Sequence, residues 1–250
     1  MTSDDPRRLV TLDVDAVLFD MDGTLVDSTS VVETLWAQFA TRYRVDLSVL
    51  LPYSHGRQTR DTISRFLPPG HDPDVVTADF GRRELIETSG ITEIPGARRL
   101  LGELPDSRVA IVTSAPRALA EVRLAAAGLR APGVLVSGDD VVRGKPDPEG
   151  YETAARRLGA SPAHCLVIED AEAGIRAGVA AGGRTLVVGS HRSATTRLLP
   201  RVKDLTAVSA TASEGRIRLH WPGRAEHDPE REIEPTNDVR LIAADVSESR

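Results

Sequence analysis

Short, continuous apolar segments recur along the chain, and segments with helical spacing lie between them. Five of these segments are rich in valine, isoleucine and leucine: Ala16–Phe19, Val109–Val112, Val134–Val136, Cys165–Ile168 and Thr185–Val188. Because their apolar residues are consecutive rather than alternating, we expect strands buried on both faces, as in a parallel sheet. Three intervening segments have the spacing of crossover helices: Pro116–Ala127, Pro148–Leu158 and Ala171–Ala181. This alternation predicts an α/β fold with a Rossmann-like, doubly wound parallel core.

One long stretch, residues 29–92, interrupts the alternation and has no clear strand pattern. Apolar residues between Val31 and Tyr43 follow the spacing of an amphipathic helix, and two further helices are expected around Ile63 and Phe80. The pair Pro95-Gly96 marks the return to the core. An all-helical insert directly after the first strand predicts a separate helical cap.

The last part of the chain has weaker patterns. Arg216–Trp221 could form a short strand, whereas Glu226–Pro235 is charged, interrupted by proline and poor in apolar residues. We therefore predict three parts: a core of residues 1–28 and 93–208, a helical cap of residues 29–92, and a C-terminal extension of residues 209–250 that is partly disordered.

The composition is that of an ordinary globular protein and excludes several classes. Of the 250 residues, 40% are hydrophobic and 27% are charged. No apolar run approaches the roughly 18 residues of a membrane span, so we expect no membrane partner. A net charge of −6 argues against nucleic acid as a partner. The N-terminal acids do not fit a secretory signal, which predicts a cytoplasmic protein. We expect a monomer or a homodimer.

The chemistry available to the chain is that of oxygen ligands and carboxylates. Its single cysteine, Cys165, excludes an internal disulfide or a thiolate metal cage. Only Lys145 and Lys203 are lysines among 31 basic residues. Lys145 lies on a loop that contains two prolines, in a chain that otherwise uses arginine for positive charge, so it is a candidate for a specific role.

Polar residues follow three of the predicted strands. In chain order these are Asp20 and Asp22, then Thr113 and Ser114, then Glu169 and Asp170. Because parallel strands end at one edge of a sheet, we expect these side chains to meet in a single crevice. Each group alone could also be a turn or a helix cap. Their coincidence at one edge, with Lys145, predicts a functional site.

These residues lie in segments that resemble the four motifs of the haloacid dehalogenase-like superfamily. The matching segments are FDMDGTLVDS (Phe19–Ser28), IVTS (Ile111–Ser114), RGKPDPEGY (Arg143–Tyr151) and VIEDAEAGI (Val167–Ile175). The helical insert has the position of this superfamily's C1-type cap. The segments Ser54–Arg57 and Glu93–Ala97 are similar to the sugar- and polyol-phosphatase branch, which includes glycerol-3-phosphate and 2-deoxyglucose-6-phosphate phosphatases.

The resemblance implies a Mg²⁺-dependent phosphatase that acts on a small phosphorylated sugar or polyol through an aspartyl-phosphate. It implies that Asp20 attacks phosphorus, while Asp22 protonates the leaving group and later activates water. Asp20, the backbone carbonyl of Asp22, and Asp170 would hold Mg²⁺. Glu169 would be a further ligand or a base beside the waters of the metal.

The resemblance also implies which residues contact the substrate. Thr113, Ser114 and Lys145 would bind the phosphoryl group. His55 and Arg57, in the most polar stretch of the cap, would contact the leaving group. A cap that closes over the sheet edge would then select the substrate.

Two other functions use the same scaffold. A phosphosugar mutase of the β-phosphoglucomutase type has a histidine about one helical turn after the first motif, where this chain has Val32. A catalytically silent binding protein would lack one of the motif residues Asp20, Asp22, Lys145 and Asp170, and all four are present. Both observations favour the phosphatase.

Overall fold

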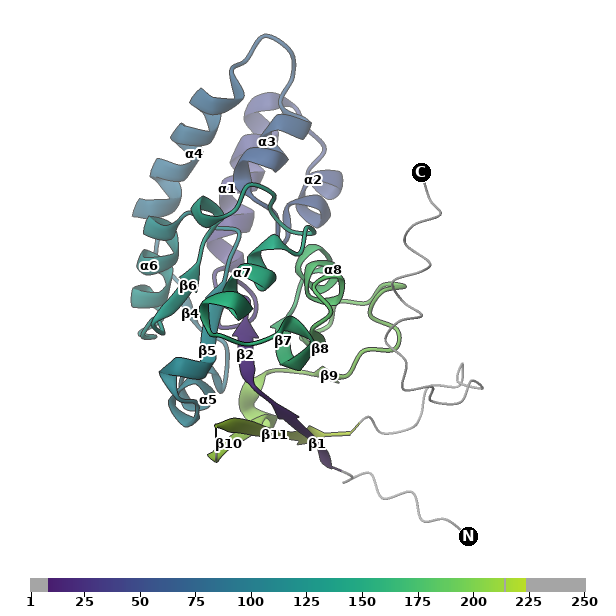
Figure 1. Ribbon diagram of the computed structural model, residues 1–250. Coiled ribbons are helices and arrows are strands. Elements are labelled where there is room, and N and C mark those ends of the chain that lie inside the picture. The colour runs from purple at the N-terminus through teal and green to yellow at the C-terminus, as the bar shows by residue number, and fades with distance from the viewer. Residues whose placement is uncertain (1–8, 214, 224–250) are drawn as a thin grey trace.

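A computed structural model describes residues 9–213 and 215–223. Its centre is a six-stranded sheet in the order β6-β5-β2-β7-β8-β9, with every neighbouring pair parallel (Figure 1), which confirms the predicted α/β core. The strands are β2 (Ala16–Phe19), β5 (Val109–Val112), β6 (Val134–Val136), β7 (Cys165–Glu169), β8 (Arg184–Val188) and β9 (Arg201–Val202). The five apolar segments form the first five of these, whereas β9 is too short to give a pattern.

The central strand β2 explains why the apolar pattern is continuous. Val17 and Phe19 belong to the apolar cluster on one face of the sheet, whereas Ala16 and Leu18 belong to the cluster on the other. All four side chains are fully buried. Helices α5 (Ala97–Glu103) and α6 (Arg117–Ala126) contribute to the first cluster, and α7 (Glu149–Arg157) and α8 (Glu172–Ala180) pack on the opposite side.

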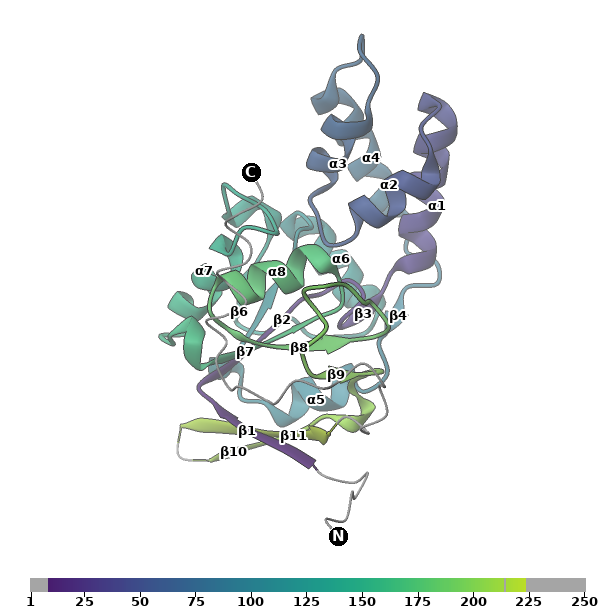
Figure 2. The same ribbon diagram turned by 90° about the vertical axis from the view of Figure 1, so that its right-hand side faces the viewer.

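Four helices form the insert between the first two strands of the parallel core. They are α1 (Thr29–Tyr43), α2 (Leu47–Ser54), α3 (Thr59–Phe66) and α4 (Pro73–Ile86), and they lie together at one end of the molecule (Figure 2). Three of them were expected, while α2 contains Pro52 and has too short an apolar pattern to predict. The Trp36 ring lies 4.4 Å from that of Phe80 and 5.5 Å from that of Phe39, centre to centre, so it belongs to the interior of this helical unit.

The helical unit is joined to the core by two adjacent segments. β3 (Val26–Asp27) and β4 (Thr92–Glu93) pair as a short antiparallel ribbon. The chain therefore leaves and re-enters the core side by side, directly beyond the carboxyl end of β2. Four 3₁₀ turns complete the core: η1 (Asp106–Arg108), η2 (Gly138–Asp140), η3 (Pro162–His164) and η4 (Leu205–Ala207). Within the described residues, no helix has the length and apolarity needed to cross a membrane.

A second, antiparallel sheet lies at the end opposite the helical unit (Figures 1 and 2). Its strands β1 (Leu9–Val14), β11 (Arg216–Pro222) and β10 (Ser209–Ser213) are ordered β1-β11-β10. The strand expected at Arg216–Trp221 is therefore present, but the folded part continues beyond residue 208. Ile217, Leu219 and Trp221 alternate along β11 as buried residues, which ties this segment to the rest of the protein. The charged stretch Glu226–Pro235 lies outside the described residues.

The small sheet makes a testable contribution to stability. Leu219 is fully buried, whereas Leu9 on the neighbouring strand β1 is 61% exposed. Leu219→Ala should lower the free energy of unfolding by about 2–5 kcal/mol. Leu9→Ala should change it by less than about 0.5 kcal/mol. Urea denaturation measures both, and equal effects of the two substitutions would show that the sheet is not part of the cooperative core.

Candidate active site

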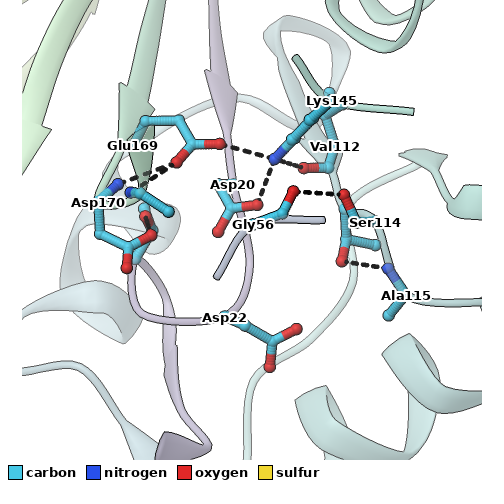
Figure 3. A network of polar contacts seen from close by, with 12 residues as sticks. Asp20, Asp22, Gly56, Val112, Ser114, Ala115, Lys145, Glu169 and Asp170 are labelled. Atoms are coloured by element: carbon cyan, nitrogen blue, oxygen red, sulfur yellow. Dashed lines mark hydrogen bonds and ion pairs between the residues drawn. The ribbon is translucent and has the colours of Figure 1, made fainter. Parts of the chain in front are cut away.

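The candidate site lies where three neighbouring strands end. Phe19 of β2 is in register with Ile111 of β5 and with Ile168 of β7. Asp20 therefore emerges between the ends of β5 and β7, beside Glu169. Figure 3 shows the side chains of Asp20, Glu169 and Lys145 converging at the carboxyl edge of the sheet.

Lys145 connects the ends of these strands. Its ammonium group donates to Asp20 Oδ1, to the backbone carbonyl of Val112 at 3.0 Å, and to Glu169 Oε1 at 2.7 Å. These three bonds use all three N–H donors of the lysine. Lys145 and Asp20 are each 5% exposed, so the charges meet almost without solvent. A planar guanidinium does not offer this compact arrangement of donors.

Glu169 holds Lys145 rather than facing open space. Its Oε1 accepts from the Tyr151 hydroxyl at 2.8 Å as well as from Lys145, and its Oε2 accepts from the backbone N–H groups of Asp170 and Ala171 at 3.0 and 3.2 Å. A Cβ on Gly174 would lie 1.5 Å from Oε1, so only glycine allows α8 to pack this close. Both carboxylate oxygens are engaged by the protein, which makes Glu169 a support for the site.

The electrostatics of the site favour a cation between the carboxylates. Burial, aided by the neighbouring charge of Glu169, raises the pKa of Asp20 to about 8. The same causes raise the pKa of Asp170 well above its usual value. Burial alone would lower the pKa of Lys145, but Asp20 and Glu169 raise it. A divalent cation bound between Asp20 and Asp170 would take the place of the protons that these raised pKa values favour.

The donor atoms fit a hard metal ion. Carboxylate oxygens of Asp20, Glu169 and Asp170 lie within 4.8 Å of one another. Because the oxygens of Glu169 are already engaged, Asp20 and Asp170 are the side chains best placed to bind a metal. Gly23 keeps the turn close to this pair, since it has φ +85° and a Cβ there would lie 2.1 Å from Asp170 Oδ2. Oxygen ligands of this kind suit Mg²⁺ or Ca²⁺.

Thr113 and Ser114 follow β5 but differ in their contacts. The Thr113 oxygen accepts from the Ala115 N–H at 3.1 Å, and its own hydroxyl proton has no acceptor among the described residues. The Ser114 hydroxyl donates to the backbone carbonyl of Gly56 in the helical unit, at 2.8 Å (Figure 3). Thr113 therefore keeps a free donor at the site, whereas Ser114 links the core to the helices above it.

A cavity at this edge of the sheet is lined by Asp20, Asp22, Thr113 and Asp170. Asp22 lies outside the Lys145 network (Figure 3). Its Oδ1 accepts from the Ser28 hydroxyl at 2.6 Å, and its Oδ2 accepts from Arg123 Nη1 at 3.0 Å. The Asp22 side chain is 28% exposed, compared with 7% for that of Asp20. Two acids separated by one residue thus have different surroundings, one buried on a lysine and one facing the cavity.

His55 and Arg57 line the cavity from above. Both belong to the turn between α2 and α3, and the same cavity wall includes Asp20 and Asp22. Burial lowers the pKa of His55, which favours its neutral form. The Arg57 guanidinium carbon lies 4.5 Å from the centre of the Tyr53 ring. These two side chains are the polar groups of the turn that a bound molecule would meet.

Four residues of the site were not identified from the sequence: Ser28 as a partner of Asp22, Tyr151 as a partner of Glu169, and the buried pair Arg123 and Glu84. Arg123 Nη2 donates to Glu84 Oε1 at 2.8 Å, across the interface between α6 and α4. A signal for this pair exists, because Arg123 follows Leu119 and Glu84 follows Phe80 at i+4 on the buried helix faces. A charge within a buried stripe indicates a paired group.

Comparisons with known proteins give matches over most of the chain. A family model described as haloacid dehalogenase-like hydrolase matches residues 14–182. The chain is 42% identical to hexitol phosphatase A of Escherichia coli over 68% of this chain and 81% of that protein. It is 36% identical to 2-deoxyglucose-6-phosphate phosphatase 1 of Saccharomyces cerevisiae over 70% of this chain and 80% of that protein. A solved hydrolase of the same family from Deinococcus radiodurans, with bound phosphate and sodium, has a TM-score of 0.55 and 32% identity over 76% of this chain and 90% of its own.

The Lys145 network should be costly to break. Lys145→Met removes the cation from beside the buried Glu169 carboxylate and takes a donor from Asp20, so it should lower the free energy of unfolding by about 3–5 kcal/mol. The matched control is Lys203→Met, because Lys203 is the other lysine and is exposed. Urea denaturation without added metal measures both variants. A loss of less than about 1 kcal/mol for Lys145→Met would mean that the network is only loosely formed in solution.

Proposed function

Because the chain belongs to the haloacid dehalogenase-like hydrolase family, we propose that it is a phosphatase that hydrolyses a small phosphorylated sugar or polyol through a phosphoryl intermediate on Asp20. The observation that carries this proposal is a buried Asp20 held by Lys145, with Asp22 in the same cavity. The substrate class rests on relatives named hexitol phosphatase and 2-deoxyglucose-6-phosphate phosphatase.

In the first step the Asp20 carboxylate attacks phosphorus and the bond from phosphorus to the ester oxygen breaks. The leaving oxygen takes its proton from Asp22, so the polyol departs as a neutral alcohol. Lys145 keeps the Asp20 carboxylate oriented, and its charge offsets that of the phosphoryl group. Thr113 donates its hydroxyl proton to a phosphoryl oxygen. The covalent route divides a very slow hydrolysis into two faster displacements.

In the second step a water molecule attacks phosphorus on the opposite side from Asp20. Asp22, now a carboxylate, accepts a proton from this water, and the bond between phosphorus and the Asp20 oxygen breaks. Inorganic phosphate leaves, with Asp20 ionised and Asp22 protonated again. One acid therefore serves both steps, which requires a side chain that faces the cavity as Asp22 does.

Asp20, Asp170 and the backbone carbonyl of Asp22 would hold Mg²⁺, for which their oxygen atoms are suitable ligands. When bound, the ion neutralises phosphate charge and helps to orient the reacting groups. Ca²⁺ prefers more ligands and longer bonds, so it should support the reaction poorly.

The helical unit would act as a cap that selects the leaving group. His55 and Arg57 supply its polar surface over Asp20 and Asp22. Val32 also lines the cavity. It stands where a mutase of the β-phosphoglucomutase type has a histidine. An apolar side chain there cannot transfer a proton, which favours release of phosphate over its return to a second sugar hydroxyl.

A panel of phosphomonoesters tests the proposed function. The purified protein is incubated with Mg²⁺ and with hexitol phosphates, hexose phosphates, glycerol phosphate, phosphoglycolate and a phosphopeptide, and free phosphate is measured. We expect the highest kcat/KM among the phosphate esters of uncharged polyols and sugars. Release from none of them, or the highest value for the phosphopeptide, would contradict the proposal.

The two acids should have separable roles. Asp20→Asn removes the nucleophile and should abolish phosphate release from every substrate. Asp22→Asn should reduce turnover of a hexitol phosphate by about 10²–10⁴-fold while Mg²⁺ still binds, because only the Asp22 backbone carbonyl would be a ligand. Steady-state phosphate release and calorimetric Mg²⁺ titration measure the two effects. Near-wild-type release by Asp20→Asn would exclude a covalent route through this residue.

Metal binding should depend on pH in a defined direction. In the metal-free protein Asp20 has a pKa raised from 3.8 to about 8, so the folded state binds a proton that the unfolded state has lost. Without metal, the free energy of unfolding should therefore fall as the pH rises from 3.8, the usual pKa, to about 8. Mg²⁺ displaces this proton, so it should raise Tm more at about pH 9 than at about pH 6. An equal Mg²⁺ effect at both values, or full activity after exhaustive EDTA treatment, would be inconsistent with this site.

The cap residues should selectively affect leaving groups that carry hydroxyls. Arg57→Ala or His55→Ala should lower kcat/KM for the best sugar or polyol phosphate by about 10- to 100-fold, the scale of one or two lost polar contacts. Hydrolysis of p-nitrophenyl phosphate should fall much less. Arg60→Ala is the matched control, since Arg60 is exposed and pairs with Asp74 on α4. Equal losses on both substrates would assign the turn a structural role only.

A further inference from the structure

Three charged side chains form a buried bridge between the core and the cap. Arg123 of α6 donates from Nη1 to Asp22 Oδ2 at 3.0 Å and from Nη2 to Glu84 Oε1 at 2.8 Å. Glu84 lies on α4 of the cap, and its Oε2 is 3.5 Å from the Thr59 hydroxyl. Arg123 is 4% exposed and Glu84 is 5% exposed. One guanidinium group thus holds two carboxylates that belong to different parts of the fold.

Stability alone is a poor explanation for this bridge. Buried ion pairs generally stabilise a protein no better than apolar residues of similar volume, because the charges must leave water. Burial raises the pKa of Glu84 even with Arg123 beside it, so its charged form is not fully compensated. Arg123 Nε is also buried and has no hydrogen-bond partner among the described residues, and an unpaired buried donor is destabilising. The groups that Arg123 binds give another reason for the bridge.

Both oxygens of Asp22 are held by groups at the boundary between core and cap. Oδ2 is bound by Arg123, which is shared with Glu84 of α4. Oδ1 accepts from Ser28 at 2.6 Å, and Ser28 immediately precedes α1, the first cap helix. All of these residues line the same cavity as Asp20. The orientation of the Asp22 carboxylate is therefore tied to the position of α1 and α4.

We propose that Arg123 is a positioning residue for Asp22, and that Glu84 makes this positioning depend on the cap. With α4 seated on α6, the guanidinium is fixed between the two carboxylates and Asp22 is aligned for proton transfer. When α4 moves away, Arg123 loses one of its anchors and Asp22 loses its alignment. The leaving group is then protonated only when the cap covers the substrate. This inference rests on the proposed phosphatase function.

The chemistry of the leaving group separates this role from a purely structural one. A polyol departs as an alkoxide unless Asp22 gives its proton to the ester oxygen while the bond from phosphorus to oxygen breaks. A p-nitrophenolate is stable as an anion and needs no proton at that step. Because kcat/KM covers only the steps up to departure of the first product, misalignment of Asp22 should affect the polyol ester and spare the aryl ester.

The experiment compares kcat/KM for a hexitol phosphate and for p-nitrophenyl phosphate in four variants of the full chain. Arg123→Met should lower the value for the hexitol phosphate by about 100-fold or more, and that for p-nitrophenyl phosphate by less than about 5-fold. Arg123→Lys keeps the charge and should recover at least about tenfold of the loss. Glu84→Gln should give a smaller loss in the same direction. Arg117→Met, on the same helix and paired with Asp140, is the control and should leave the ratio of the two substrates unchanged.

A second measurement follows the intermediate itself. Asp22 must also accept a proton from water in the second step, so Arg123→Met should accumulate phosphorylated protein during turnover of p-nitrophenyl phosphate. Acid quenching and measurement of the protein-bound phosphoryl group detect it. A variant that is merely less stable would contain less active enzyme, not more intermediate.

Equal losses on both substrates in folded Arg123→Met protein, or no loss on either, would overturn the proposal. If Arg123→Met does not fold, Glu84→Gln decides the question by the same ratio of kcat/KM values. This variant removes the charge of Glu84 but keeps an oxygen acceptor for Arg123, so it should disturb folding less. The wild-type protein separates this inference from the proposed function. No phosphate release by the wild type from any ester refutes the phosphatase, whereas release with an unchanged ratio in the variants refutes only the role of Arg123 and Glu84.

Discussion

The ammonium group of Lys145, buried between two carboxylates, is the interaction on which the site depends. It joins Asp20 after β2, Val112 at the end of β5 and Glu169 at the end of β7, three strands that are adjacent in the sheet. The carboxylates need the cation because burial raises the pKa of Asp20 to about 8 even with Lys145 present. Tyr151 and the backbone of Asp170 and Ala171 complete the support around Glu169. The loop that carries Lys145 is thereby fixed to the strand ends.

The rest of the architecture separates two tasks. In the proposed function, the core supplies charge and alignment for a phosphoryl group, through residues whose bonds lie almost entirely within the core. The helical unit supplies the opposite wall of the cavity. Among the described residues it contacts the core through few side-chain hydrogen bonds: Ser114 to Gly56, Gln58 to Gly138, and Arg123 to Glu84. Asp22 belongs to both tasks, since Ser28 and Arg123 hold it at the junction. In the proposed mechanism, substrate selection and acid–base chemistry would therefore meet at a single carboxylate, that of Asp22.

Most of the core could be predicted from the sequence because buried parallel strands leave continuous apolar segments and their ends carry the site residues. Asp20 and Glu169 were found in this way, since topology alone brings strand ends together. Lys145 was found by another signal, because it is one of two lysines in a chain that otherwise uses arginine. The small sheet was largely missed because neither β1 nor β10 has a pattern of its own. In addition, β1 pairs with β11 across roughly 200 residues of sequence. Arg123 and Glu84 were missed because their pairing depends on how α4 packs on α6, which the spacing of residues within one helix does not determine.

Every step of the proposed mechanism requires that Asp20 carries the phosphoryl group during turnover. The direct measurement is acid quenching of the protein after mixing with its best phosphomonoester, followed by proteolysis and mass spectrometry of the peptide that contains Asp20 and Asp22. We expect the added mass of one phosphoryl group, located on Asp20, removed by hydroxylamine and absent from Asp20→Asn. A protein that releases phosphate while this peptide stays unmodified, in Asp22→Asn as well as in the wild type, would contradict it.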